Sequence, residues 1–359
     1  MKTGRTLSEM AQELDRQLHA KKDYLVDTRA LTMTVPEVGP ALTIASGSQS
    51  TAPMIVNDIA HRQIGQYLGI PAKYYDKMRA ELPDLLAHNV NQWLLSQPDT
   101  RMIRTLDGTA RAFLSDKYRR IDNYEVAQTV LPIIARMGQQ DGATIESCEL
   151  TESRMYLKVV NPRIQAEVKK GDIVQAGLVI SNSETGQGSI TVSPLIYRLV
   201  CSNGMIAADN SLRKYHIGRV TEAGEDFSIY RDETVEADDR AFLMKIEDTV
   251  RAAVDQTKFE AIVARMRETT EARIEPKTAP QIVELAAKEY SLTKDEGDGI
   301  LGHLIAGGDL SLYGLANAVT RHSQDVRSYD RATELEATGW KMITMAPSLW
   351  SQLNAAASR

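Results

Sequence analysis

The chain opens with apolar residues at helical spacing and then changes to alternation. Thr6 and Glu9 have the spacing of a capping box. Apolar residues follow three or four positions apart, at Leu7, Met10, Leu14 and Leu18. From Tyr24 to Val35 the apolar and polar residues alternate instead, which is typical of a strand with one polar face. The pattern predicts a short amphipathic helix followed by a strand.

Residues 57 to 97 carry the start and stop signals of three short helices. Asn57 is a favoured N-cap residue, and Gly69 is suited to end the helix that Asn57 starts. Pro71 and Pro83 each occupy a position where the first turn of a helix tolerates a proline.

Two β-rich runs, residues 100 to 106 and 109 to 115, flank the dipeptide Asp107-Gly108. This dipeptide favours a two-residue type I′ turn, so the runs predict a hairpin. With that turn and a regular register, Arg104 lies directly opposite Arg111. Opposed like charges destabilise a sheet unless a carboxylate or a bound anion compensates them.

Turn residues divide residues 143 to 192 into β-rich runs, which predicts an antiparallel meander. Ser193-Pro194 has the composition of a helix start, and Asn203-Gly204 that of a helix stop. We therefore expect a short helix from Leu195 to Cys201 that packs on one face of the meander.

After about Tyr230 the period is helical, with a long helix expected from Thr234 to Arg273 and more after Pro276, Thr293 and Ser311. The predicted fold class is α+β: an antiparallel β-meander with packed helices, followed by an all-α acidic C-terminal region. We expect three parts: residues 1–56 with a helix and strands, residues 57–229 as the α+β core, and residues 230–359 as a helical domain.

Charge divides unevenly along the 359 residues. The formal net charge is −6, which argues against a uniformly basic coat for nucleic acid. Residues 1–220, however, hold 26 Lys and Arg against 23 Asp and Glu, whereas residues 221–359 hold 16 against 25. The acidity is therefore a property of the C-terminal region, and a local basic face in the first part remains compatible with the composition.

The sequence excludes several classes of protein. There is no run of 18 apolar residues and no signal-peptide pattern, so we expect a cytoplasmic protein that is not inserted in a membrane. The cysteines Cys148 and Cys201 have neither disulfide nor metal-clip spacing. The phosphate-loop, hydrolase-elbow and zinc-protease motifs are missing, and the six histidines are scattered. We expect no cofactor, no metal site and no enzymatic activity.

The hairpin and the residues after it are the most basic segment. Residues 101–120 contain six Lys and Arg against two Asp, with Tyr118 among them. Cations for phosphates and rings for bases are what a single-strand groove requires. Ion pairs between this segment and the acidic helices are the alternative explanation.

A second candidate surface lies at residues 181 to 215, where small polar residues at Ser181, Asn182, Ser183, Ser189 and Thr191 precede a group of cations. The same composition is common in exposed hairpins. Taking both surfaces together, we predict nucleic-acid contacts at Arg104, Arg111, Lys117, Tyr118, Arg119, Arg120, Arg198 and Lys214.

Five ordered segments resemble the phage/plasmid-like protein family, a family of unknown function. They are Leu68-Gly69-Ile70-Pro71, Arg111 to Arg119, Ile180 to Glu184, Cys201 to Gly204 and Asn317 to Arg321. The resemblance implies an origin in a bacteriophage, prophage or plasmid, and it supplies no catalytic residues. The meander with its basic hairpin is also similar in architecture to the single-strand annealing proteins of phages.

These observations favour a cytoplasmic homo-oligomer that binds single-stranded DNA and supports annealing or recombination. A second hypothesis is a non-enzymatic factor whose acidic helices, residues 231–359, bind a host protein. A third is a metal-dependent nuclease with carboxylates such as Asp116 and Asp122 at the metal.

Overall fold

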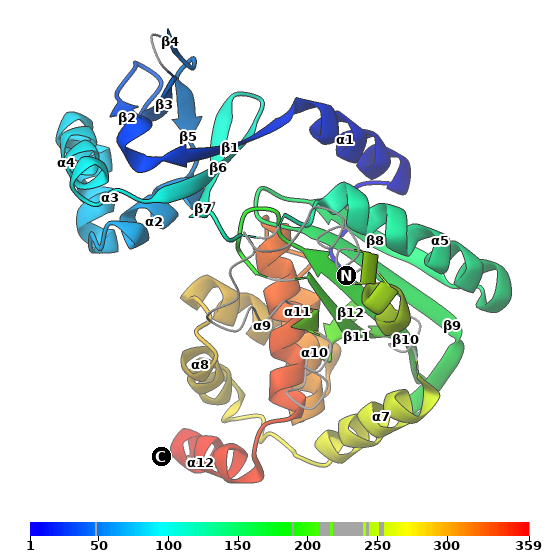
Figure 1. Ribbon diagram of the computed structural model, residues 1–359. Helices are drawn as coiled ribbons and strands as arrows, with labels where there is room; N and C mark the ends of the chain where they lie inside the picture. The colour runs from blue at the N-terminus through cyan, green and yellow to red at the C-terminus, as the bar shows by residue number, and fades with distance from the viewer. Residues whose placement is uncertain are drawn as a thin grey trace.

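The fold is α+β, with two sheets and helices packed against both, as the sequence predicted (Figure 1). A computed structural model describes residues 1–46, 49–118, 120–188, 190–207, 216–217, 240–241, 244–250 and 255–358. No helix among the described residues is long and apolar enough to cross a membrane.

The first sheet, with the helices that cover it, forms an N-terminal module at the upper left of Figure 1. Its strand order is β1-β6-β7-β5-β3-β2, with β4 paired to β3, and only the β5–β7 pairing is parallel. The strands are β1 (Lys21–Asp27), β2 (Leu31–Thr34), β3 (Ala41–Ser46), β4 (Gln49–Ser50), β5 (Met54–Val56), β6 (Thr100–Leu106) and β7 (Thr109–Ser115). Because β1 pairs with β6 and β5 with β7, the boundary that we expected at residue 56 runs through a sheet.

Three helices cover this sheet where the sequence placed them. They are α2 (Asp58–Tyr67), α3 (Ala72–Glu81) and α4 (Pro83–Ser96). The Asn57 side chain accepts the N–H of Ala60 and so caps α2. Pro83 is the first residue of α4, and Gly69 adopts φ 68° just after α2. Local capping chemistry is sufficient to set these helix limits.

The β6–β7 hairpin has the predicted turn but a different register. Asp107 and Gly108 both have positive φ, 51° and 75°, as a type I′ turn requires. A bulge between Arg104 and Thr105 then moves Arg104 opposite Ala112. The predicted opposition of Arg104 and Arg111 is therefore wrong, because the extra residue in one strand changes every pairing beyond it.

The second sheet is the predicted meander, in the order β12-β11-β10-β9-β8, with β13 paired to β11. Its strands are β8 (Thr144–Leu150), β9 (Met155–Lys169), β10 (Asp172–Asn182), β11 (Ile190–Arg198), β12 (Asn203–Ile206) and β13 (His216–Ile217). The helix expected from Leu195 to Cys201 is wrong, because β11 continues through Pro194 to Arg198. The carbonyl of Pro194 accepts the N–H of Ala207, one residue past the end of β12. The N–H and C=O of one residue in an antiparallel strand point to the same side, so the missing N–H of Pro194 faces Ala207, beyond the last β11–β12 pair, Leu195 with Ile206.

Helices cover both faces of this second sheet. The N-terminal helix α1 (Leu7–Ala20) has the predicted Thr6 capping box, and it packs with α5 (Asn123–Asp141) over Leu178 and Ile180 of β10. Val179, between those two residues, contacts Ala337 on the other side. The C-terminal helices are α7 (Gln256–Thr270), α8 (Ala279–Glu289), α9 (Lys294–Gly307), α10 (Leu312–His322), α11 (Tyr329–Ile343) and α12 (Pro347–Ala357).

The C-terminal helices and the second sheet share one hydrophobic core. Val174 and Ile196 of the sheet belong to the same buried cluster as Ile262 of α7, Tyr313 of α10 and Leu335 of α11. Residues 255–358 therefore complete the core of the sheet. We call this sheet, with α1, α5 and the C-terminal helices, the body.

Candidate functional site

Arg104, the central cation of the predicted interface, is enclosed at the junction between the N-terminal module and the body. Its side chain is 0% exposed. The guanidinium donates to both oxygens of Asp23 at 3.0 and 3.1 Å, to Asp122 at 2.6 Å and to the carbonyl of Glu184 at 3.0 Å. Burial opposes ionisation of Asp122, but Arg104 and Lys21 outweigh it and hold the pKa of that carboxyl below its usual value.

Arg111 and Arg198 are also paired with buried carboxylates. Arg111 donates to Glu184 Oε2 at 2.5 Å, and the other oxygen of Glu184 accepts the N–H of Asn123 at the start of α5. Arg198 binds both oxygens of Asp172 at 2.7 Å. In their present conformation these three arginines offer no free charge to a ligand, and they bind the elements of the protein to one another.

The other predicted contacts differ in exposure. Tyr118 is partly buried and donates to the carbonyl of Ser183 at 3.1 Å. Lys117 is exposed, and Arg120 is 58% exposed with a carboxylate oxygen of Asp23 at 3.6 Å. Arg119 and Lys214 lie outside the described residues. The hairpin region therefore presents Lys117 and Arg120 to solvent, among the predicted contacts that the structure describes.

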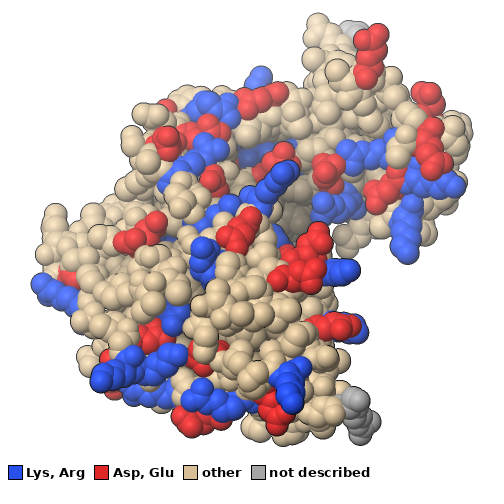
Figure 2. All heavy atoms as spheres, turned by 180° about the vertical axis from the view of Figure 1, so that it is seen from behind, with Lys and Arg blue, Asp and Glu red and all other residues tan. Residues whose placement is uncertain are grey.

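A cleft of about 520 Å³ lies where α2 of the N-terminal module meets the body. Hydroxyl groups line it at Ser153, Ser181, Thr191 and Ser193. Two of them, Ser181 and Thr191, belong to the second surface that the sequence singled out. Figure 2 shows the molecule hollowed between the N-terminal module and the body, with cationic and anionic side chains around the hollow.

Asn182 and Ser183 of the same surface are buried. Asn182 donates to the carbonyl of Ile121 and to the side chain of Asn123, at 3.0 and 2.9 Å. Ser183 accepts the N–H groups of Thr185 and Gln187. Ser189 lies outside the described residues. The predicted polar surface is thus divided between the cleft wall and the interior.

Two arginines outside the predicted contacts line the cleft, one from the N-terminal module and one from the body. Arg62 is an exposed residue of α2, and Arg154 belongs to the β8–β9 turn of the body. Neither forms an ion pair with a described residue. Arg154 donates to the carbonyl of Gln187, which holds its guanidinium against the cleft wall.

Three of the four cleft carboxylates are already engaged. Asp58 pairs with Arg79 at 2.7 Å, and Glu334 pairs with Arg331 at 2.8 Å. Asp330 accepts hydroxyl hydrogen bonds at 2.7 to 3.0 Å from Ser153, Tyr156 and Thr151. The fourth is Glu152. Ion-paired carboxylates repel an anionic ligand less than free ones do, so Asp58 and Glu334 oppose it little. Asp330 and Glu152 keep their negative charge, and the two arginines counter it.

The exposed face of α3 adjoins the cleft through the Arg79–Asp58 ion pair. It carries Lys73, Tyr74 and Lys77, all exposed, with Tyr74 at 52%. Positions 73 and 77 are one helical turn apart, so the two lysines are neighbours on the helix surface and Tyr74 lies beside them. Cations and an aromatic ring on one surface are the combination that we predicted for the hairpin.

Among the described residues, one group has the spacing of metal ligands: His303, His322 and Asp325. His303 comes from α9 and His322 from the end of α10, which explains why the sequence, with scattered histidines, indicated no cluster. Only the i,i+3 spacing of His322 and Asp325 was visible. Asp122, one of the two carboxylates considered for a nuclease, is instead bound to Arg104 and Lys21.

Comparison with known proteins identifies a family without an assigned function. No curated protein and no solved structure matches the chain. A family model described as a domain of unknown function, DUF932, matches residues 112–350, about two thirds of the chain. The match begins within β7 and ends within α12, so it covers the second sheet, α5 and most of the C-terminal helices, and it leaves α1 and most of the N-terminal module outside. The chain belongs to this DUF932 family of unknown function.

Proposed function

We propose that this protein binds single-stranded nucleic acid in the cleft and along the exposed face of α3, without strong sequence preference. One observation carries the proposal: Arg62 of the N-terminal module and Arg154 of the body line the same polar cleft, and neither is paired with a carboxylate among the described residues. We further propose, from the sequence resemblance, that a phage, prophage or plasmid encodes it, and, from its cysteine content and its similarity in architecture to annealing proteins, that it acts in the cytoplasm as a homo-oligomer.

Each part of this surface suits a different part of a nucleic-acid strand. The arginines pair with phosphates, and the small hydroxyl groups let a sugar-phosphate backbone approach closely. On α3, Tyr74 offers an exposed ring for base stacking beside Lys73 and Lys77. Stacking requires unpaired bases but does not depend on which base is present. We therefore expect this surface to bind single strands without a preference for sequence.

The test is fluorescence anisotropy with a labelled oligothymidylate, including a salt titration. Four phosphate contacts, to Arg62, Arg154, Lys73 and Lys77, should weaken affinity roughly 50-fold between 50 and 200 mM salt. Substituting both cleft arginines, Arg62→Glu and Arg154→Glu, should lower affinity more than about tenfold and flatten the salt dependence.

Arg163→Glu is the matched control. Arg163 is an exposed arginine of β9, about 30 Å along the strand from Arg154 at roughly 3.3 Å per residue. It makes the same charge change as each cleft substitution and should leave affinity unchanged. If the cleft double variant binds as the parent does, the cleft is not the interface. Cleavage of the labelled strand on addition of Mg²⁺ or Mn²⁺ would favour the nuclease hypothesis instead.

A further inference from the structure

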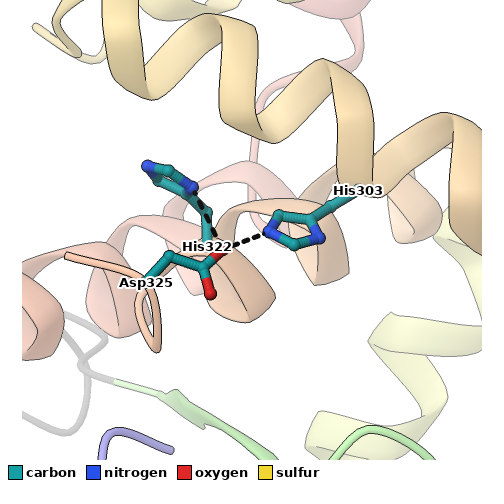
Figure 3. Close-up of side chains that lie close together, drawn as sticks. All are labelled: His303, His322 and Asp325. Carbon is teal, nitrogen blue, oxygen red and sulfur yellow. Dashed lines mark hydrogen bonds and ion pairs between the residues drawn. The ribbon is translucent and has the colours of Figure 1, made fainter.

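Two imidazoles and one carboxylate converge where α9 lies beside the C-terminal end of α10 (Figure 3). His303 projects from α9, His322 is the last residue of α10, and Asp325 lies in the turn that follows. His303 Nε2 is 2.5 Å from Asp325 Oδ2, and His322 Nδ1 is 3.6 Å from the same oxygen. One nitrogen or oxygen from each of the three residues lies within 4.8 Å of the others.

The surrounding structure holds these groups in place and leaves one of them without a hydrogen bond. His322 is 12% exposed, and its Nδ1 is buried with no hydrogen-bond partner among the described residues. Gly299 of α9 lies directly over the ring, since a Cβ there would come within 2.4 Å of His322 Cε1. The second oxygen of Asp325 lies 3.4 Å from Arg321 Nη1, which orients the carboxylate.

We propose that His303, His322 and Asp325 bind a divalent first-row transition metal, with Zn²⁺ as the expected ion. Two imidazole nitrogens and a carboxylate oxygen are a ligand set that zinc and non-haem iron sites use. Donors about 2.0 to 2.1 Å from a tetrahedral Zn²⁺ lie roughly 3.3 Å apart, close to the 3.6 Å between His322 and Asp325. At 2.5 Å, His303 and Asp325 need to separate by less than about 1 Å.

Three protein ligands leave a coordination position open. Asp325 is 44% exposed, so the open position faces solvent and is available to a water molecule or to an oxygen atom of a ligand. Structural zinc sites are usually closed by four protein ligands, whereas three ligands are typical of sites that exchange the fourth. The site shares no residue with the cleft, so it stands or falls independently of nucleic-acid binding.

Isothermal titration of the metal-free full chain with ZnCl₂, at neutral pH and without an affinity tag, tests the site. We expect one Zn²⁺ per chain. Each of His303→Gln, His322→Gln and Asp325→Ala should weaken binding at least about a hundredfold, because loss of a ligand costs no less than loss of a group that orients one. His19→Gln, a change at an exposed histidine of α1, should have no effect.

Thermal unfolding separates a metal site from a simple ion pair between helices. Zn²⁺ should raise the Tm of the parent and of the His19→Gln variant, and should leave the Tm of the three ligand variants unchanged. Absence of stoichiometric binding to the parent overturns the proposal. The proposal is also overturned if each of the three variants keeps the Zn²⁺ affinity of the parent while its own Tm is lower, because the residues would then form only an ion pair. If His322→Gln fails to fold beneath α9, Asp325→Ala still tests the site, because its side chain is substantially exposed.

Discussion

Buried arginines determine how the N-terminal module joins the body. Arg104 loses its hydration entirely, and two carboxylates and a carbonyl replace the water. Its partners come from β1 and from the residue that caps α5, so a single guanidinium connects segments distant in sequence. A charge that binds three parts of the fold together contributes more to the structure than to ligand binding, because releasing it would leave the carboxylates uncompensated.

Removing this cation should therefore be costly, and removing its exposed neighbour should not. Arg104→Met leaves Asp23 and Asp122 without their buried partner, and it should lower the free energy of unfolding by about 3–5 kcal/mol. Arg120→Met makes the same chemical change beside Asp23 at an exposed position, and it should cost less than about 1 kcal/mol. Urea denaturation of both variants measures the difference. Equal losses would mean that the enclosure of Arg104 contributes nothing to stability.

Tyr75 joins helix α3 to α2, in addition to the ion pair between Arg79 and Asp58. The ring of Tyr75 lies against Gly65, where a Cβ would come within 2.9 Å of it, and its hydroxyl is 2.9 Å from His61 Nδ1. The other nitrogen of His61 is buried without a partner among the described residues. Burial lowers the pKa of His61 to about 4. The position of the α3 face that we propose for base stacking thus depends on a neutral histidine.

This contact predicts a loss of stability in mild acid. The unfolded chain protonates His61 near its ordinary pKa of 6.5, whereas the folded chain does so only near 4, so falling pH favours unfolding between these values. The free energy of unfolding should drop by about 2 kcal/mol from pH 7 to pH 5 through this group. His61→Gln should remove that part of the pH dependence. Urea denaturation at both pH values, with His19→Gln as the control, measures it; an unchanged slope in His61→Gln would contradict the assignment.

Local signals in the sequence predicted helix caps and turns correctly, but they did not predict how distant strands pair. The Thr6 capping box, the Asp107-Gly108 turn and the Asn57 cap all form as predicted, because each depends on atoms a few residues apart. The helix expected at residues 195–201 is wrong because Ser193-Pro194 does not start a helix. Pro194 is tolerated inside β11 because it lies beyond the end of β12, and that alignment of the strands is not visible in the local sequence. The bulge beside Arg104 also depends on how two strands align, so the local sequence did not predict it.

The candidate sites were harder to predict than the fold. The basic run at residues 101–120 is present, but the alternation of side chains across a strand and the bulge decide which cations face inward. Arg62 and Arg154 are separated by ninety-two positions in the sequence. They line one cleft only because the fold brings α2 and the β8–β9 turn to the same place. The histidines of α9 and α10 converge through helix packing alone.

At the scale of the whole molecule, the acidic C-terminal region is part of the body. Lys158 of β9 and Glu336 of α11 form an ion pair at 2.6 Å in which both side chains are 0% exposed. Lys158 also lies 4.6 Å from the centre of the Tyr329 ring. Deleting residues 231–359, the natural test of a host-binding surface, would therefore expose the core of the sheet. That hypothesis needs surface substitutions in its test.

If the helices and the second sheet form one folding unit, breaking this ion pair should loosen both. Glu336→Gln leaves Lys158 buried without its counter-charge and should lower the free energy of unfolding by about 3–5 kcal/mol. Hydrogen exchange read by mass spectrometry should show a matching loss of protection in β9–β11 and in α10–α11, with a smaller change in β1–β7.

The double variant Lys158→Met with Glu336→Leu is the control, because replacing a whole buried pair with apolar side chains is often neutral. It should regain most of the protection that Glu336→Gln loses. Loss of protection confined to α11 in the single variant would instead mean that the C-terminal helices unfold apart from the sheet. A change in β1–β7 as large as that in the body would mean that the buried arginines at the junction make the two sheets a single cooperative unit.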